Sequence, residues 1–121
     1  MRPISRVFVG RSRPATEVLP ARFRSKATKD VDEAVRYYVD GADAEVATRF
    51  VDQLEQTIRQ LELHPELGSV RFAFELDLPG VRSFRVEAFP YLIFYLVRSD
   101  RLDVLRVLHA SRDVPTTLRD P

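Results

Sequence analysis

The fold is decided by the stretch LPGVRSFRVEAFPYLIFYLVRSDRLDVLRVLHASRD, residues Leu78–Asp113, which predicts three short strands separated by two tight turns. Its centre, Tyr91–Val97, has seven apolar or aromatic residues without a break. Such a run is typical of a strand covered on both faces, so we expect it in the middle of a sheet. Before it, Phe84, Val86 and Ala88 alternate with charged residues, as in a half-buried strand.

The last strand of this stretch, Leu102–His109, is less regular. Leu102, Val104 and Leu108 keep one phase, and Arg106 breaks it with a charge. We interpret this break as a candidate functional position.

The residues before this stretch predict one strand and two helices. Leu19–Lys26 alternates apolar residues with arginines, which indicates a strand that joins the later sheet. A first helix is expected from near Asp30, which can cap it, to Gly41. Asp43 can cap a second helix, which ends at His64-Pro65.

Both helices carry apolar stripes that need a surface to cover. The stripe residues repeat every three or four positions: Val31, Ala34, Val35, Tyr38, Val46, Ala47, Phe50, Leu54, Ile58 and Leu61. Because the connection is short, the helices must be antiparallel. The predicted fold is α+β in the order β-αα-βββ, an antiparallel sheet with a helical hairpin packed on one face.

Length and composition point to one domain. The 121 residues are 45% hydrophobic, which is enough to bury a core. We expect residues 18–121 to form this domain and residues 1–17 to be an N-terminal extension whose order the sequence does not define. The lack of cysteine excludes disulfides, cysteine-ligated metals and thiol nucleophiles. No apolar run approaches the roughly 18–20 residues of a membrane span, so a cytoplasmic protein is expected.

Charge is unevenly distributed along the chain. Residues 1–29 carry a net charge of +7, residues 30–66 a net charge of −7, and residues 67–121 a net charge of +1. A basic N-terminal segment can attract nucleic acid, and it is equally typical of a disordered arm.

The usual catalytic motifs are missing. The sequence has no GxSxG, no glycine-rich phosphate loop and no HExxH. Its two histidines, His64 and His109, fall on different predicted elements, so we expect no metal and no cofactor. His109 could act as a general acid or base, although a hydrogen-bonded structural role is the simpler interpretation.

Four arginines fall in or beside the predicted strands: Arg82, Arg85, Arg106 and Arg112. Guanidinium groups suit bidentate recognition of phosphate or carboxylate, so these residues are candidates for binding a target. If Arg85 and Arg106 share a face, that face is basic. The alternative is that each arginine pairs with a local acid, which would imply nothing about a ligand.

Several motifs together resemble the RelE/ParE toxin superfamily, especially its ParE or plasmid-stabilisation branch. They are ATKDVDEAVRYY at Ala27–Tyr38, HPELG at His64–Gly68, LPGVRSFRV at Leu78–Val86, PYLIFYLV at Pro90–Val97 and LDVLRVLHASRD at Leu102–Asp113. The resemblance covers about residues 20–118, and the closing strand is its most specific part.

This resemblance implies the toxin half of a bacterial type II toxin–antitoxin pair, held inactive by an antitoxin that wraps the sheet and the hairpin. Toxins similar to ParE act on DNA gyrase, and RelE-like toxins cut messenger RNA on the ribosome. Operator DNA would be reached only through the antitoxin.

The residues favour the ParE branch and a toxin that is not an enzyme. RelE-like cleavage uses lysines, arginines and a late tyrosine or histidine, whereas the only lysines here, Lys26 and Lys29, precede the first helix. The alternatives are a ribosome-dependent ribonuclease using Arg85, Arg106 and His109, and an inactive homologue that only binds antitoxin.

The antitoxin would cover the sheet face that the helices leave open, because aromatic-rich strands do not stay exposed without a partner. We expect Phe84, Tyr91 and Tyr95 on that face, and Phe94 directed at the helices. An acidic antitoxin tail would suit the neighbouring arginines.

Overall fold

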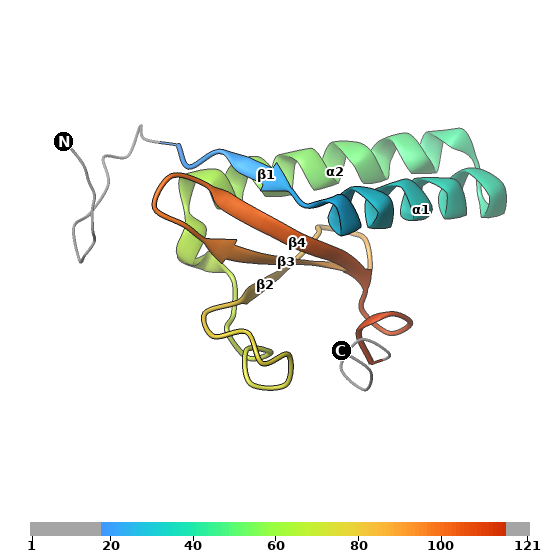
Figure 1. Ribbon diagram of the computed structural model, residues 1–121. Coiled ribbons are helices and arrows are strands. Elements are labelled where there is room, and N and C mark those ends of the chain that lie inside the picture. The colour runs from blue at the N-terminus through green and yellow to red at the C-terminus, as the bar shows by residue number, and fades with distance from the viewer. Residues whose placement is uncertain (1–17, 116–121) are drawn as a thin grey trace.

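The computed structural model describes residues 18–115 of the 121. The expectation for residues 1–17 lies outside this part of the chain. The elements follow in the order β1 (Ala21–Phe23), α1 (Ser25–Gly41), α2 (Ala44–Leu63), the 3-10 helix η1 (Pro65–Leu67), β2 (Arg82–Arg85), β3 (Tyr91–Val97) and β4 (Leu102–His109). The predicted α+β order β-αα-βββ is confirmed (Figure 1).

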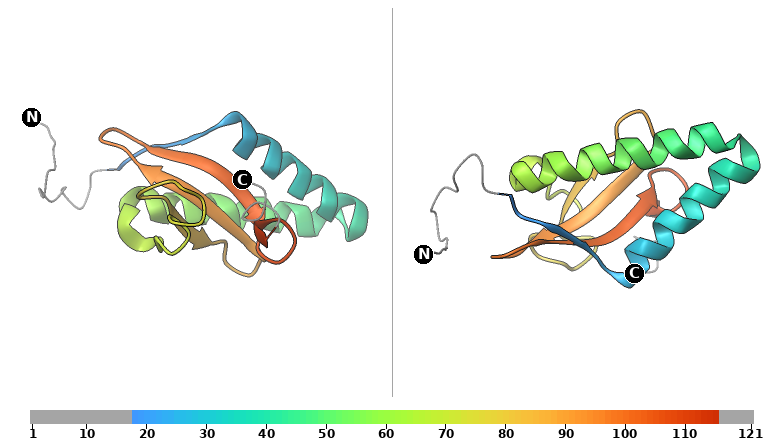
Figure 2. Two further views of the ribbon diagram at one scale, coloured as in Figure 1. Left: turned by 60° about the horizontal axis from the view of Figure 1, so that its bottom comes forward. Right: turned by 90° about the horizontal axis from the view of Figure 1, so that it is seen from above.

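The strands form one sheet in the order β1-β4-β3-β2, so the apolar strand β3 is internal, as predicted. The pairs β2–β3 and β3–β4 are antiparallel. The pair β1–β4 is parallel, which makes the sheet mixed and which the sequence did not indicate. Both helices lie along one side of this sheet (Figure 2).

The two helices begin differently. α2 begins as predicted, because the side chain of Asp43 accepts a hydrogen bond from the backbone N–H of Val46. α1 begins directly after β1, at Ser25, and no side chain caps it. The prediction that Asp30 caps α1 is therefore wrong. Asp30 lies inside the helix and binds β4 instead, through Arg106 and the N–H of Val107.

The main core lies between the helices and the sheet. Phe50, Leu61 and Ile93 are fully buried there, and the rings of Tyr38, Phe50, Phe89 and Tyr91 pack against one another. Packing of these apolar side chains against the helix stripes is the main stabilisation of the fold.

The expectation that Tyr91 and Tyr95 lie on an open sheet face is wrong. Their exposed fractions are 2% and 0%, and both belong to the main core, which Phe84 also packs against. The Tyr95 hydroxyl accepts a hydrogen bond from the N–H of Gly68 and donates one to the carbonyl of Pro65. Phe94, expected to face the helices, packs on the opposite side of the sheet.

The chain itself covers part of that opposite face. The turn-rich segment of residues 70–80 folds over it, and Phe72 packs on Phe94 with ring centroids 5.6 Å apart. Val81, Leu108 and Val114 complete this second, smaller core. Figure 1 shows the segment on the side of the sheet away from the helices.

Asp103 holds one end of the sheet together. Its carboxylate is almost fully buried and accepts hydrogen bonds from Arg24 after β1, from Arg98 after β3 and from Arg101 before β4. These bonds, above all that from Arg98, lower the pKa of Asp103 to about 2.

We predict that Gly68→Ala destabilises the fold by about 2–4 kcal/mol, because a Cβ at this position would lie 2.5 Å from the Tyr95 hydroxyl and 2.9 Å from Arg82 Cβ. Urea unfolding measures the effect. Gly41→Ala is the control, since no atom lies within 4 Å of its Cβ. Equal stability of the two variants would contradict the prediction.

We predict that Asp103→Asn loses stability in a pH-dependent way. Because the pKa of Asp103 is lowered in the folded state, the ionised carboxylate stabilises the fold above about pH 4, and this contribution disappears as the pH falls toward about 2. The variant should be less stable than the wild type by on the order of 1–2 kcal/mol at neutral pH, and the gap should close in acid. Urea unfolding across this pH range measures the gap, and a constant gap would refute the assignment.

Candidate functional site: the arginines of the sheet

The four arginines predicted to bind a target do not form one patch. Arg82 is occupied with the backbone: its Nη1 donates to the carbonyl oxygens of Glu66 at 3.1 Å and Gly68 at 2.7 Å. Arg82 therefore ties β2 to the turn that follows α2.

Arg106 is held by a carboxylate. Its Nε and Nη2 donate to the two oxygens of Asp30 at 2.8 and 3.0 Å, a bidentate pair that joins β4 to α1. Arg106 lies opposite Phe94 and Arg85 opposite Leu92, so both arginines belong to the sheet face away from the helices, as the basic-face hypothesis required. The ion pair with Asp30 neutralises Arg106 there.

Arg85 is exposed and has no ion pair within residues 18–115. Because it stands near the end of β2, all of its guanidinium donors can reach a bound molecule. Of the four arginines, it is the one that the fold leaves most available.

Arg112 is the centre of a cluster at the end of β4. Its Nη2 donates to the Tyr91 hydroxyl at 3.2 Å, its Nε lies 3.4 Å from Asp113, and its guanidinium stacks over the Tyr37 ring at 4.9 Å. Tyr37 was not singled out in the sequence. The sequence feature that could have identified Tyr37 is its position outside the apolar stripe of α1, because an aromatic side chain there remains exposed, in this case 53%.

His109 belongs to the same cluster and its ring is already occupied. Its Nδ1 accepts hydrogen bonds from the backbone N–H groups of Ser111 at 3.3 Å and Arg112 at 3.1 Å. Burial and the nearby Arg112 lower the pKa of His109 below 6.5. In the neutral ring, Nε2 therefore carries the proton, and Nδ1 has no free lone pair to accept another.

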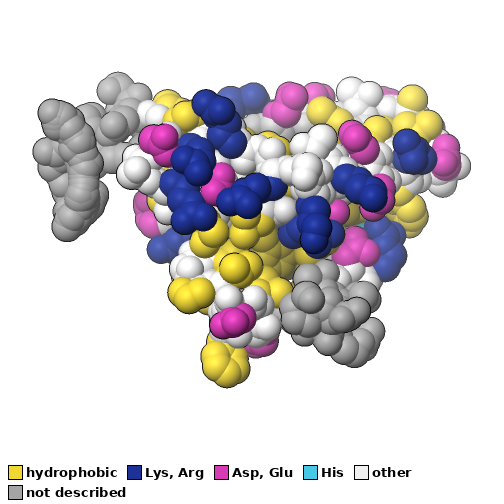
Figure 3. Space-filling view, viewed as in Figure 1, with side chains coloured by type: hydrophobic (Ala, Val, Ile, Leu, Met, Phe, Trp, Pro, Cys, Tyr) yellow, Lys and Arg dark blue, Asp and Glu magenta, His cyan; other side chains and the backbone are white. Residues whose placement is uncertain are grey.

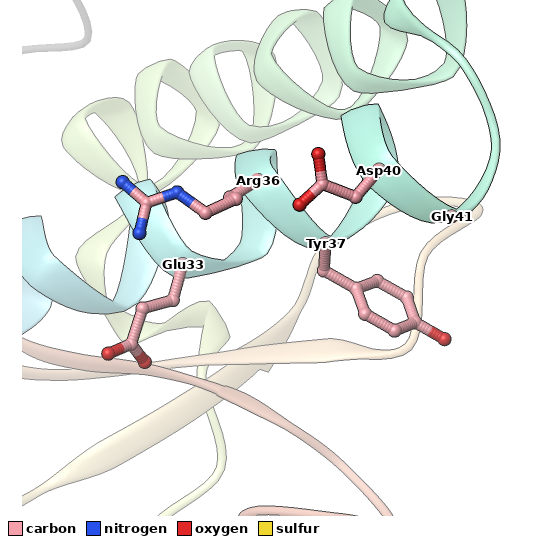
Figure 4. A pocket seen from close by; sticks show the side chains of 5 residues that line it. All are labelled: Glu33, Arg36, Tyr37, Asp40 and Gly41. Atoms are coloured by element: carbon pink, nitrogen blue, oxygen red, sulfur yellow. The ribbon is translucent and has the colours of Figure 1, made fainter.

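Two surface hollows lie on the helical hairpin. One, of about 410 Å³, is lined by Glu33, Arg36, Tyr37, Asp40 and Gly41, all on α1 (Figure 4). The other, of about 490 Å³, lies between β1 and the helices and combines apolar side chains such as Val51 and Ile58 with acidic ones such as Asp32 and Glu55. Neither hollow is lined by a serine, cysteine or histidine.

The family follows from comparison with known proteins. Residues 21–114 match the family described as ParE toxin of type II toxin-antitoxin system, parDE. The chain belongs to this family of ParE toxins. The superfamily and branch indicated by the sequence motifs are thereby confirmed, and membership of such a system implies an antitoxin partner.

A solved structure supports the fold of this ParE toxin. The structure, described as the chromosomal ParDE TA system from P. aeruginosa, is similar with a TM-score of 0.66 and 22% sequence identity, over 79% of this chain and 100% of that chain. At this identity the similarity shows a shared fold. No curated protein matches the chain.

The described part of the ParE chain contains no helix that is long and apolar enough to cross a membrane. It also contains no group of three or more potential ligand side chains placed to hold a metal ion.

Two of the three residues considered for RNA cleavage, Arg106 and His109, are already engaged in other bonds. Arg106 is bound to Asp30, and His109 Nδ1 is bound to backbone N–H groups. A general base needs a free lone pair within reach of the proton that it removes. The contacts of His109 are those of a side chain that closes the turn after β4.

We predict that His109 is an Nε2-protonated imidazole with a pKa below 6.5. His64→Gln leaves it as the one histidine of the chain, so that nitrogen-15 NMR reports its tautomer and its titration without overlap. Because its pKa is lowered on folding, His109 should also reduce the free energy of unfolding as the pH falls through about 6.5. An Nδ1-protonated ring, or a pKa above 6.5, would contradict the prediction.

Proposed function

We propose that this ParE toxin inhibits DNA gyrase by binding it, without catalysing a reaction, and that its antitoxin neutralises it in the cytoplasm. The observation that carries the proposal is the engagement of the candidate catalytic residues in structural bonds. Arg106 and His109 stabilise the fold through Asp30 and through the turn after β4. The available chemistry is recognition rather than bond breaking.

The surface around Arg85 and Arg112 is the proposed contact with the target. Both carry guanidinium groups on exposed positions at the same end of the sheet as Tyr37. Arginine and tyrosine are enriched among the residues that dominate protein–protein binding energy, because they combine apolar surface with directed hydrogen bonds.

The antitoxin has a surface suited to it on the sheet face opposite the helices. Leu92, Leu96 and Leu105 are only half-buried there, and Phe74 is 92% exposed. Figure 3 shows apolar side chains on this side of the molecule below a band of basic ones. A segment with apolar side chains would cover this surface, which supports neutralisation by wrapping.

The test is a gyrase supercoiling assay with the purified chain. We expect inhibition with trapped cleaved DNA, and we expect Arg85→Ala to raise the inhibitory concentration by roughly tenfold because a central interface arginine is worth more than 1 kcal/mol. Arg59→Ala, an exposed arginine on α2, removes the same charge and should leave inhibition unchanged.

Gyrase activity that is unaffected by stoichiometric toxin would refute the target. Codon-linked cuts in messenger RNA after induction would instead assign the chain to the ribonuclease alternative. Growth arrest that is relieved when the antitoxin is co-expressed is the expected result for neutralisation.

A further inference from the structure

Away from the proposed target surface, three arginines share one carboxylate. Arg24 Nη2 and Arg98 Nε lie 3.1 and 3.0 Å from Oδ2 of Asp103, and Arg101 Nε lies 3.1 Å from Oδ1. We call Arg24, Arg98, Arg101 and Asp103 the Asp103 cluster. Its arginines lie just after β1, just after β3 and in the turn before β4, and Asp103 lies in β4, so only the folded sheet assembles it.

The charges of the Asp103 cluster are not balanced. One carboxylate would be enough to anchor one guanidinium, and here it anchors three. Asp100 pairs with Arg101 at 2.9 Å, and Arg22 lies opposite Asp103 in the β1–β4 register and so on the same face. With these two residues included, four arginines stand against two aspartates.

The arginines keep free donors toward solvent. Their side chains are 54%, 43% and 38% exposed for Arg24, Arg98 and Arg101, whereas that of Asp103 is 5% exposed. A guanidinium has five N–H donors, and only one of them in Arg24 and in Arg98 is used by Asp103. The buried carboxylate therefore fixes the position of the arginines while their outer edges stay open.

We infer that the Asp103 cluster binds the phosphodiester backbone of a nucleic acid. Guanidinium forks match phosphate geometry, and arginines already held in place lose little conformational entropy on binding. Basic sequence continues on both sides of Arg24, because residues 18–29 also contain Arg22, Lys26 and Lys29 and no acidic residue. Figure 3 shows basic side chains gathered over the region of β1 and the β3–β4 turn.

An acidic protein is the weaker match. Protein interfaces are organised around buried apolar or aromatic anchors, whereas phosphate contacts need none. Leu102 and Val104, next to the cluster, are buried in the main core. Phe23 and Val97 are partly exposed, but they pair with Val104 and Leu102 in the sheet and so face away from the cluster. Leu96, opposite Asp103, is itself half-buried, so the cluster has no large exposed apolar anchor beside it. The inference goes beyond gyrase inhibition, and it differs from the expectation that operator DNA is reached only through the antitoxin.

The test measures binding of the full-length chain to a fluorescein-labelled duplex DNA of about 20 base pairs and random sequence, by fluorescence anisotropy between about 50 and 200 mM salt. The double variant Arg98→Ala/Arg101→Ala should bind roughly tenfold more weakly at the lower salt, and the slope of log Kd against log salt should fall by about 2. The double variant Arg49→Ala/Arg59→Ala removes the same charge from α2 and should bind within about twofold of the wild type.

A further variant separates organised arginines from diffuse charge. Asp103→Asn makes the protein more positive, so simple attraction predicts tighter binding, whereas loss of the shared anchor predicts weaker binding. Its circular dichroism spectrum shows whether this variant is folded. If it is unfolded, the comparison of the two double arginine variants decides the question. Equal losses of DNA affinity in the two double arginine variants would overturn the inference.

The remaining arms identify the ligand. An RNA duplex of the same length tests whether the cluster binds any phosphodiester backbone or prefers DNA or RNA. Binding of either duplex supports the inference. Polyglutamate that competes as well as DNA at equal charge would overturn the inference in favour of an acidic protein. Gyrase inhibition by Arg98→Ala/Arg101→Ala is measured separately, so failure of DNA binding leaves the proposed function standing.

Discussion

Carboxylates at the rim of the sheet are the constraint on which the rest of this ParE structure depends. β1 has only three residues and pairs with Leu102–Val104, so the second half of β4 has a neighbouring strand only on the β3 side. The N–H groups of Val107 and His109 would lack partners there, and Asp30 and Asp113 accept from them instead. Unsatisfied backbone groups at a buried edge cost stability, so these side chains substitute for a longer strand.

The same bonds explain why the arginines divide as they do. Asp30 also binds Arg106, so the residue that bonds the strand edge neutralises one arginine of the sheet. Arg82 binds two carbonyl oxygens at the turn after α2. Arg85 and the three arginines of the Asp103 cluster keep exposed donors, as do Arg22 and Arg112. Which arginines can bind a partner therefore depends on which ones already form bonds within the fold.

Much of this architecture could be predicted from local sequence patterns. The unbroken apolar run of Tyr91–Val97 identified the internal strand, and the stripes and Asp43 identified the helical hairpin. The sequence could not show which side chains of that run point toward the helices, because every residue is apolar and both faces of the strand are covered. Tyr95 and Phe94 were therefore assigned to the wrong faces. Alternation alone cannot decide between two cores.

The candidate site was harder to predict because it depends on long-range contacts. Arg106, which broke the pattern of the last strand, adjoins a β-bulge: Phe94 pairs with Arg106 and Tyr95 with Val104, so Leu105 is an extra residue. The partner of Arg106 is 76 residues away in Asp30, which local sequence had marked as a helix cap. Sequence shows which arginines exist, and only tertiary structure shows which remain unpaired.

The parallel pairing of β1 with β4 has a consequence for the order of folding. β2, β3 and β4 are joined by short turns and can pair as soon as they are synthesised, whereas Ala21 must find Leu102 across most of the domain. Closing such a loop is entropically costly and slow compared with forming a hairpin. β1, the first strand of residues 18–115 to be synthesised, is therefore expected to join the sheet last, and a chain interrupted before Leu102 would leave it without a partner strand.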